Sequence, residues 1–275
     1  MAYSKKKRVP KNPYSILIDK SPSEAAQLLA VQKNGLLLEF ISNPSPRVTL
    51  AALTQTGLAI RYVENPTEEM KIAAISQTGY AIKFIDSPSD KLIGLAVKRN
   101  YELLQLFENP SEILQLIAVK KSMAALKFLK DIPESVQEYC AIKDPKRMKF
   151  FTPSLPVQFA AVNKNGKNIR YIKNPCVEVQ RAAIAKNKNA IHYIDNPAEE
   201  IQLEMVTKFG GTIALFPNAS KDVQLAAVRK APTAIQFIKN PDEEVQMLAV
   251  QGRKSAIMFI KQPCTQARFL AKLMY

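Results

Sequence analysis

Residues 153–174 read PSLPVQFAAVNKNGKNIRYIKN, and residues 175–196 read PCVEVQRAAIAKNKNAIHYIDN. Both stretches begin with proline, continue through Val-Gln and Ala-Ala, and end on Ile-x-Tyr-Ile-x-Asn. Self-similarity at a short fixed period is the signature of a repeat protein, in which each unit buries its apolar face only against its neighbours. The sequence therefore predicts a solenoid.

The same register extends from the two quoted repeats to both sides. The slot that holds their first proline recurs at Pro22, Pro44, Pro66, Pro88, Pro110, Ile132, Pro153, Pro175, Pro197, Ala219, Pro241 and Pro263. The spacing is 22 residues except between Ile132 and Pro153, where it is 21. We predict an all-α fold, a right-handed α-solenoid of about twelve helix–turn–helix repeats. One repeat domain would cover residues 21–275, with a register break near 140–153, after a basic arm at residues 1–20.

Each slot of the repeat indicates a local role. The residue before the anchor, such as Asn43, is predicted to cap a helix that begins with the proline. The slot eight residues later is alanine in ten repeats, with Cys140 and Met205 as the others, which indicates a close approach of helices. Glycines such as Gly35 and Gly210 are predicted to end the first helix in a left-handed conformation.

A second, shorter helix of the form Ala-Ile-x-Phe-Ile follows in each repeat. Its aromatic slot, occupied by residues such as Phe40, Phe84 and Phe237, is predicted to lie in the core. A glutamine after the Val slot recurs in eight repeats, for example at Gln180 and Gln246. It predicts a ladder of hydrogen bonds to neighbouring backbone; the alternative is a binding face of exposed amides.

This pattern resembles the short helical repeats, with Asn-Pro at each junction, that are grouped as a domain of unknown function in bacteriophages, large DNA viruses and some bacteria. It is also similar to HEAT-type and variant leucine-rich solenoids. The resemblance covers residues 21–275 and implies the fold, with a phage or viral source among the alternatives. It implies no catalytic residues.

Composition and motifs argue against several classes of protein. No apolar run reaches the roughly 20 residues of a membrane span, and the basic N-terminus has no apolar stretch behind it that would make a secretory signal. The three cysteines are far apart, and the single histidine, His192, is predicted to be a surface residue. There is no phosphate-binding glycine loop, nucleophile elbow or Cys/His pair. We expect a cytoplasmic protein without enzymatic activity, cofactor, metal or small-molecule substrate.

The formal net charge of +15 is concentrated in two segments. Residues 1–12 hold five Lys or Arg and no acid, and residues 143–188 hold eleven against two acids. The slot before the aromatic residue is often basic, which predicts a ridge along the second helices. The candidate nucleic-acid-binding residues are Arg61, Lys83, Lys127, Lys143, Lys146, Arg147, Lys149, Lys164, Lys167, Arg170 and Lys186.

Two functions remain open on this evidence. The first is a binding solenoid that holds DNA or RNA mainly through phosphates at its basic centre, where segment 140–151 is predicted to be an irregular basic loop. The second is a scaffold that docks an acidic protein partner, within a viral assembly or against a host factor. The competing explanation of the charge is a solvated face, with each helix-end lysine placed by the helix dipole. The sequence gives no oligomeric state.

Overall fold

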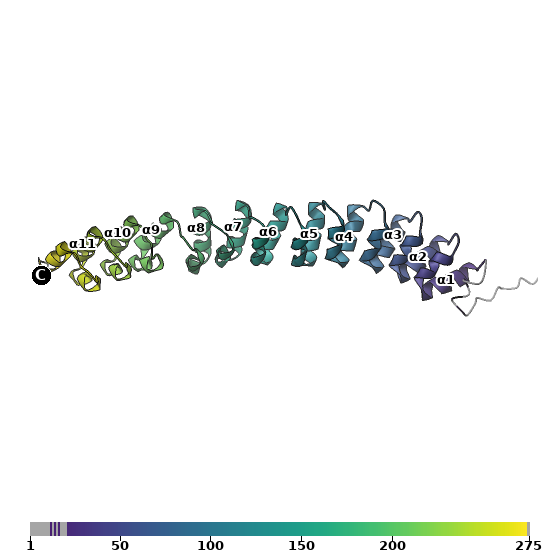
Figure 1. Ribbon diagram of the computed structural model, residues 1–275, viewed down its shortest axis with the longest axis horizontal. Coiled ribbons are helices and arrows are strands. Elements are labelled where there is room, and N and C mark those ends of the chain that lie inside the picture. Colours follow the sequence, from purple (N-terminus) through teal and green to yellow (C-terminus); the bar gives the residue numbers. More distant parts are fainter. Residues whose placement is uncertain (1–11, 13, 15, 17–20, 274–275) are drawn as a thin grey trace, which may run out of the picture. The chain divides into compact units, whose positions relative to one another are not determined.

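The computed structural model describes residues 12, 14, 16 and 21–273. Within these residues the chain alternates α-helices with short 3₁₀-helices, labelled η, and contains no strand (Figure 1). The predicted all-α solenoid of short repeats is confirmed, except that the second helix of each repeat is 3₁₀ and not α. Most of the predicted basic arm at residues 1–20 lies outside the described residues.

The chain divides into two compact units, Met1–Val136 and Gln137–Tyr275, and the boundary falls inside α6 (Glu134–Lys143). Before it come α1 (Glu24–Lys33), η2 (Gly35–Phe40), α2 (Pro46–Gln55), η3 (Gly57–Tyr62), α3 (Glu68–Gln77), η4 (Gly79–Phe84), α4 (Asp90–Arg99), η5 (Tyr101–Leu106), α5 (Glu112–Lys121) and η6 (Met123–Phe128). After it come η7 (Pro145–Phe150), α7 (Leu155–Lys164), η8 (Gly166–Tyr171), α8 (Val177–Lys186), η9 (Lys188–Tyr193), α9 (Glu199–Lys208), η10 (Gly210–Leu215), α10 (Lys221–Lys230), η11 (Pro232–Phe237), α11 (Glu243–Gly252), η12 (Lys254–Phe259) and α12 (Thr265–Leu273).

The α-helices are capped one residue after the proline, so the predicted cap position is wrong. The hydroxyl of Ser45 accepts from the N–H of Val48 at 3.3 Å, three residues into the helix, and Thr67 does the same for the next repeat. The residue before the proline takes a left-handed backbone at Asn43, with φ of 51°, and at Asn174, with φ of 48°. Asparagine tolerates that conformation better than most residues. Cap-forming residue types flank the proline on both sides, and the spacing alone does not choose between them.

The glycines that follow the α-helices are required by close packing. No described glycine has a positive φ, so the predicted left-handed helix ends are wrong. A Cβ atom on Gly35, Gly57 or Gly166 would overlap the carbonyl oxygen at the alanine slot of the next repeat. The N–H of Gly57 also donates to Oε1 of Gln77 in that repeat, at 2.8 Å. Glycine therefore lets η2, η3 and η8 rest directly on the next α-helix.

The alanine slot forms the centre of the core in both units. Its fully buried members are Ala30, Ala52, Ala74, Ala96, Ala118, Cys140, Ala161, Ala183, Ala227 and Ala249. Larger buried side chains such as Leu53 and Ile75 in unit 1, and Val162 and Val228 in unit 2, flank the slot. A Cβ-only side chain permits the close helix approach that the repeat predicted, and this prediction is confirmed.

The predicted glutamine ladder is present in part: Gln180 and Gln246 link two repeats, whereas Oε1 of Gln115, Gln158 and Gln202 has no hydrogen-bond partner. Nε2 of Gln180 donates to the carbonyl of Pro175 at 2.8 Å, and Oε1 accepts from the N–H of Ala198, in the next repeat, at 2.9 Å. Gln246 bonds Pro241 and Cys264 in the same way, at 2.9 and 2.8 Å. Buried amides thus link consecutive turns of backbone, which satisfies polar groups that the core would otherwise leave unpaired.

The missing residue lies after η7 and not in an irregular loop. Residues 140–143 complete α6, and 145–150 form η7, so the predicted irregularity of 140–151 is wrong. The connection from η7 to α7 has four residues, 151–154, where the next connection has five, 172–176. Phe151 packs against the core in place of the isoleucine that Ile172 supplies in the next repeat. The deletion removes an exposed slot that is acidic at Glu64 and Asp195.

Candidate nucleic-acid interface

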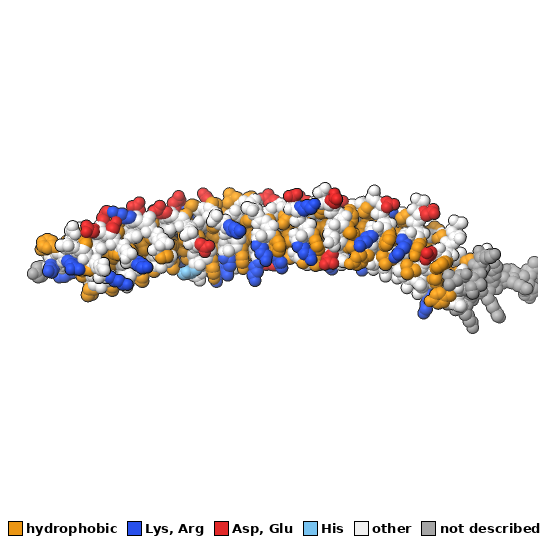
Figure 2. All heavy atoms as spheres, viewed as in Figure 1, with side chains coloured by type: hydrophobic (Ala, Val, Ile, Leu, Met, Phe, Trp, Pro, Cys, Tyr) orange, Lys and Arg blue, Asp and Glu red, His pale blue; other side chains and the backbone are white. Residues whose placement is uncertain are grey.

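The α-helices of each unit run in the same direction, which sorts the charges to two edges. The hydroxyl of Ser45, the cap of α2, donates to Glu24 in the first turn of α1 at 2.6 Å, so the two helix starts are adjacent. The same bond joins Ser111 to Asp90 at 2.7 Å. Most α-helices carry an acid in the first turn and a lysine in the last turn, as the helix dipole favours. In Figure 2, the acidic side chains of unit 2 gather along the upper edge, and most of its basic side chains lie toward the lower edge.

The slot before the aromatic residue is exposed in each η helix from η2 to η12, and it holds Lys or Arg in five of these eleven helices. Its cations form one row in each unit, with Arg61, Lys83 and Lys127 in unit 1 and Lys149 and Arg170 in unit 2. In the described part of the chain, none of the five makes an ion pair. Their charges are therefore available to an external anion. His192 occupies the same slot and is exposed, as predicted.

The aromatic slot next to this row is divided: Tyr62, Tyr171 and Tyr193 pack against the core, whereas the prediction of a core position is wrong for the exposed rings. Its exposed members are Phe40, Phe84, Phe150, Phe237 and Phe259, with 40–56% of each side chain's surface accessible. Tyr62, Phe128, Tyr171 and Tyr193 are half-buried. The alanine and isoleucine before them, such as Ala81 and Ile82, already supply the buried face of the η helix. A preceding cation does not signal this exposure, because only Phe84 and Phe150 among the five exposed rings follow one.

Two arginines bridge the aromatic rings of successive repeats. The guanidinium carbon of Arg170 lies 3.9 Å from the ring centre of Tyr193, in the next repeat, and 5.8 Å from that of Tyr171. Arg61 lies 4.7 Å from Phe84 and 5.7 Å from Tyr62. In both arginines Nε donates at 3.0 Å to a backbone carbonyl three residues earlier. The guanidinium is thus held in place, with its two terminal nitrogens left for other acceptors.

The lysines of the two rows also lie over aromatic rings. Nζ of Lys127 is 4.6 Å from the ring centre of Phe128, and Nζ of Lys149 is 5.3 Å from that of Phe150. Nζ of Lys83 is 5.5 Å from the ring of Tyr80, whose hydroxyl accepts from Asn100 of the next repeat at 3.1 Å. Each exposed contact of this kind contributes about 0.5–1 kcal/mol. Cations and rings therefore alternate along the η helices.

The central basic cluster lies at the start of unit 2, on α6, η7, α7, η8 and α8. Its exposed members are Lys143, Lys146, Lys149, Lys164, Arg170 and Lys186, and its half-buried members are Arg147 and Lys167. Residues 145–177 contain seven Lys or Arg and no acid, and α7 has no acid in its first turn. Arg147 differs from the rest because its Nε pairs with Asp144 at 2.9 Å. The structure thus brings the predicted cluster onto adjacent elements but gives Arg147 an internal partner.

Two titratable groups at the margins of the cluster are shifted. Burial, together with the smaller effect of the nearby Asp144 carboxylate, raises the pKa of the Cys140 thiol to about 11, and Arg147 opposes the rise. The pKa of Glu178 is lowered, first by a hydrogen bond from the Cys176 thiol and then by a backbone N–H. At neutral pH the Cys140 thiol therefore stays neutral and the Glu178 carboxylate stays ionised. Neither group adds positive charge to the cluster.

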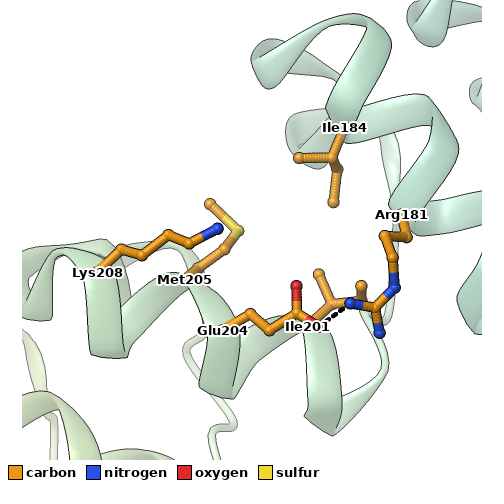
Figure 3. Close-up of a pocket in the computed structure, with 6 residues that line it drawn as sticks. All are labelled: Arg181, Ile184, Ile201, Glu204, Met205 and Lys208. Atoms are coloured by element: carbon orange, nitrogen blue, oxygen red, sulfur yellow. Dashed lines mark hydrogen bonds and ion pairs between the residues drawn. The ribbon is translucent and has the colours of Figure 1, made fainter.

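A small pocket lies between α8 and α9, where the alanine slot holds a larger residue (Figure 3). Met205 takes that slot in α9, and α8 and α9 pack less closely than the neighbouring α-helices of unit 2. Arg181, Ile184, Ile201, Glu204, Met205 and Lys208 line a space of about 60 Å³. The guanidinium of Arg181 pairs with Glu204 across the seam. The pocket is too small for a drug-sized ligand, since such sites span about 300–1,000 Å³.

The described residues contain no cluster of His, Cys, Asp and Glu that could hold a metal ion. They also include no helix that is long and apolar enough to cross a bilayer. Comparisons with protein-family models, with curated proteins and with solved structures found no match for this chain.

Proposed function

We propose that this chain is a non-enzymatic binding protein that holds nucleic acid through its phosphates, along the η-helix rows and the central basic cluster. The observation that carries the proposal is the row of exposed cations without ion-pair partners in each unit. The row of unit 2 lies within the acid-free stretch at residues 145–177. Helix dipoles account for a lysine at the end of each α-helix. They do not account for cations on the η helices or for the loss of the compensating acids.

The arrangement suits a phosphate backbone for a physical reason. Neutralising phosphates with Lys and Arg releases condensed counterions, which drives binding without reading the base sequence. Lys149 and Arg170 lie on η7 and η8, which pack side by side, so their charges repeat along the unit. Lys173 adds a further exposed cation in the connection after η8, a slot that holds Asp195 in the next repeat. A linear polyanion meets several such charges at once.

The test is a pair of matched double charge reversals in unit 2. Lys149→Glu with Arg170→Glu alters the row, and Lys239→Glu with Lys261→Glu makes the same charge change at two exposed lysines beyond η10. Arg147 is left intact because its reversal would face Asp144 and disturb η7. Affinity for a generic oligonucleotide, measured by fluorescence anisotropy at about 50 mM salt, should fall far more for the first pair.

Equal losses for the two pairs would reduce the effect to net charge and overturn the assignment of the site. An unmodified protein that binds no oligonucleotide at that salt concentration would overturn the proposal altogether. The other candidate partner is an acidic protein surface, as for many α-solenoids. Capture of one stoichiometric protein that survives nuclease treatment, together with absent oligonucleotide binding, would assign the row to that partner. Either partner is consistent with the cytoplasmic location that we propose.

A further inference from the structure

The exposed aromatic rings beside the cations have no role in the core, so they call for another explanation. Phe84 and Phe150 each leave 43% of their surface accessible, and Tyr80 leaves 46%. Exposing a large ring forgoes about 25 cal/mol for each Å² of apolar surface left in water. Repeats 4 and 9 hold Leu106 and Leu215 in the same slot, so the fold does not itself require an aromatic residue there.

We propose that the η-helix rows hold single-stranded nucleic acid, with bases stacked on Tyr80, Phe84 and Phe150 and phosphates at the neighbouring cations. This inference rests on the proposed function and adds the class of nucleic acid. Stacking on aromatic side chains is how proteins bind unpaired bases without sequence preference, because every base has a π-face. A duplex keeps its bases stacked on one another, so no base face is available to stack on these rings.

The geometry supplies both elements of such a site in each unit. In unit 1, η3 and η4 pack side by side and place Arg61 over Phe84, with Lys83 over Tyr80. In unit 2, η7, η8 and η9 follow one another, with Lys149 over Phe150 and Arg170 over Tyr193. A cation and an aromatic ring thus follow one another in the repeats that contain η3, η4, η7 and η8. Other helical-repeat proteins hold single-stranded RNA in this register, with one base for each repeat.

Charge selects this occupant over an apolar protein segment. We call the aromatic rings and cations on η3, η4, η7, η8 and η9 the stripe. These five η helices contain no acid. The Nε–carbonyl bonds of Arg61 and Arg170 fix each guanidinium with its terminal nitrogens directed away from its own backbone acceptor. Planar guanidinium groups match phosphate geometry with two donors at once. A regular alternation of planar rings and phosphate-binding groups matches a chain that itself alternates bases and phosphates.

The experiment compares two double variants at the same slot. Phe84→Leu with Phe150→Leu removes rings next to cations, and Phe237→Leu with Phe259→Leu removes equally exposed rings preceded by Gln236 and Met258. Leucine is chosen because it already occupies the slot in two repeats. The ligands are oligo(dT) of about 16 nucleotides and a mixed-sequence duplex of the same length. We expect the first pair to weaken oligo(dT) binding at least about tenfold, with duplex affinity and the second pair nearly unchanged.

A second readout uses the unmodified protein and does not depend on the variants folding. The chain has nine tyrosines and no tryptophan, so its emission reports tyrosine alone. Saturating oligo(dT) should quench part of that emission through Tyr80, and the duplex at saturation should not.

Three other outcomes would overturn the inference, and they separate it from the proposed function. Unchanged oligo(dT) affinity in Phe84→Leu with Phe150→Leu, while Lys149→Glu with Arg170→Glu weakens both ligands, would leave phosphate binding without stacking. Absence of binding to either ligand would remove both proposals. Binding of a polyglutamate peptide as tight as that of oligo(dT), and lost in the same phenylalanine variants, would assign the stripe to an acidic polypeptide.

Discussion

A Cβ atom on Gly210 would stand 2.5 Å from the carbonyl oxygen of Ala227, which belongs to the next repeat of unit 2. Contact at this distance means that η10 rests on α10 with no room for a side chain between them. The neighbouring Gly211 faces open space, where a Cβ atom would come no closer than 3.9 Å to Phe237. Two adjacent glycines in one helix thus differ in what they permit.

Gly210→Ala should therefore lower the free energy of unfolding by about 1–3 kcal/mol, the usual cost of forcing extra volume into a packed site. Gly211→Ala should be neutral or stabilising by up to about 1 kcal/mol, because alanine restricts the unfolded chain. Urea midpoints from circular dichroism would compare the two variants, and hydrogen exchange of the η10 amides would localise the effect. Equal midpoints would contradict the close approach of η10 and α10.

The glutamine ladder gives a second matched pair. Gln180 bonds two repeats, whereas Oε1 of the equally buried Gln115 has no partner. The residue that would donate to Gln115, by analogy with Ala198, is Pro133, which has no N–H. Gln180→Met should cost about 1 kcal/mol more than Gln115→Met, because it leaves the part-buried N–H of Ala198 unsatisfied. Unfolding midpoints would check this, and an equal or larger cost at Gln115 would contradict the ladder.

Sequence reasoning succeeded where the repeat itself carried the information. The 22-residue register predicted the all-α solenoid, and the recurring alanine predicted the close helix approach, because only small side chains fit there. The glutamine ladder followed from a polar residue that is regular on a buried face. These features depend on the length of the repeat and on side-chain size, and both can be read directly from the sequence.

The errors arose where one residue type serves two conformations. Asn-Pro-Ser offers caps on both sides of proline, so the cap was placed at Asn43 instead of Ser45. Glycine signals either a left-handed turn or a lack of space, and Gly35 is the second case. The aromatic slot was assigned to the core because its apolar spacing suits an α-helix. The segment is instead a 3₁₀-helix in which Ala81 and Ile82 are buried and Phe84 is exposed.

The shifted thiol predicts a pH dependence. The folded-state pKa of Cys140 is raised from 9.0 to about 11, so the folded protein retains a proton that the unfolded chain loses. The stability that goes with it is fully present below pH 9 and is lost as the pH rises toward 11. Unfolding midpoints of the wild type should fall over this window more than those of Cys140→Ala.

Thiol labelling at about pH 8, near the ordinary pKa of cysteine, provides an independent check. A disulfide reagent such as Ellman's should modify the exposed Cys176 quickly and Cys140 only at the rate of local opening. Labelling of Cys140 as fast as that of Cys176 would contradict the buried position of the thiol. Cys176→Ser with Cys264→Ser removes labelling of the two accessible thiols and isolates that of Cys140.

The salt dependence of binding distinguishes phosphate contacts from other modes of association. If the rows make about five phosphate contacts to a single strand, the logarithm of the association constant should fall against the logarithm of salt concentration with a slope of about −3.5. Affinity would then drop about 100-fold between about 50 and 200 mM salt. Removing two contacts with Lys149→Glu and Arg170→Glu should reduce the slope by about 1.4, whereas Lys239→Glu with Lys261→Glu should leave it unchanged. A slope that the first pair does not alter would mean that these cations act only through net charge, because a direct contact releases its own counterions and a distant charge does not.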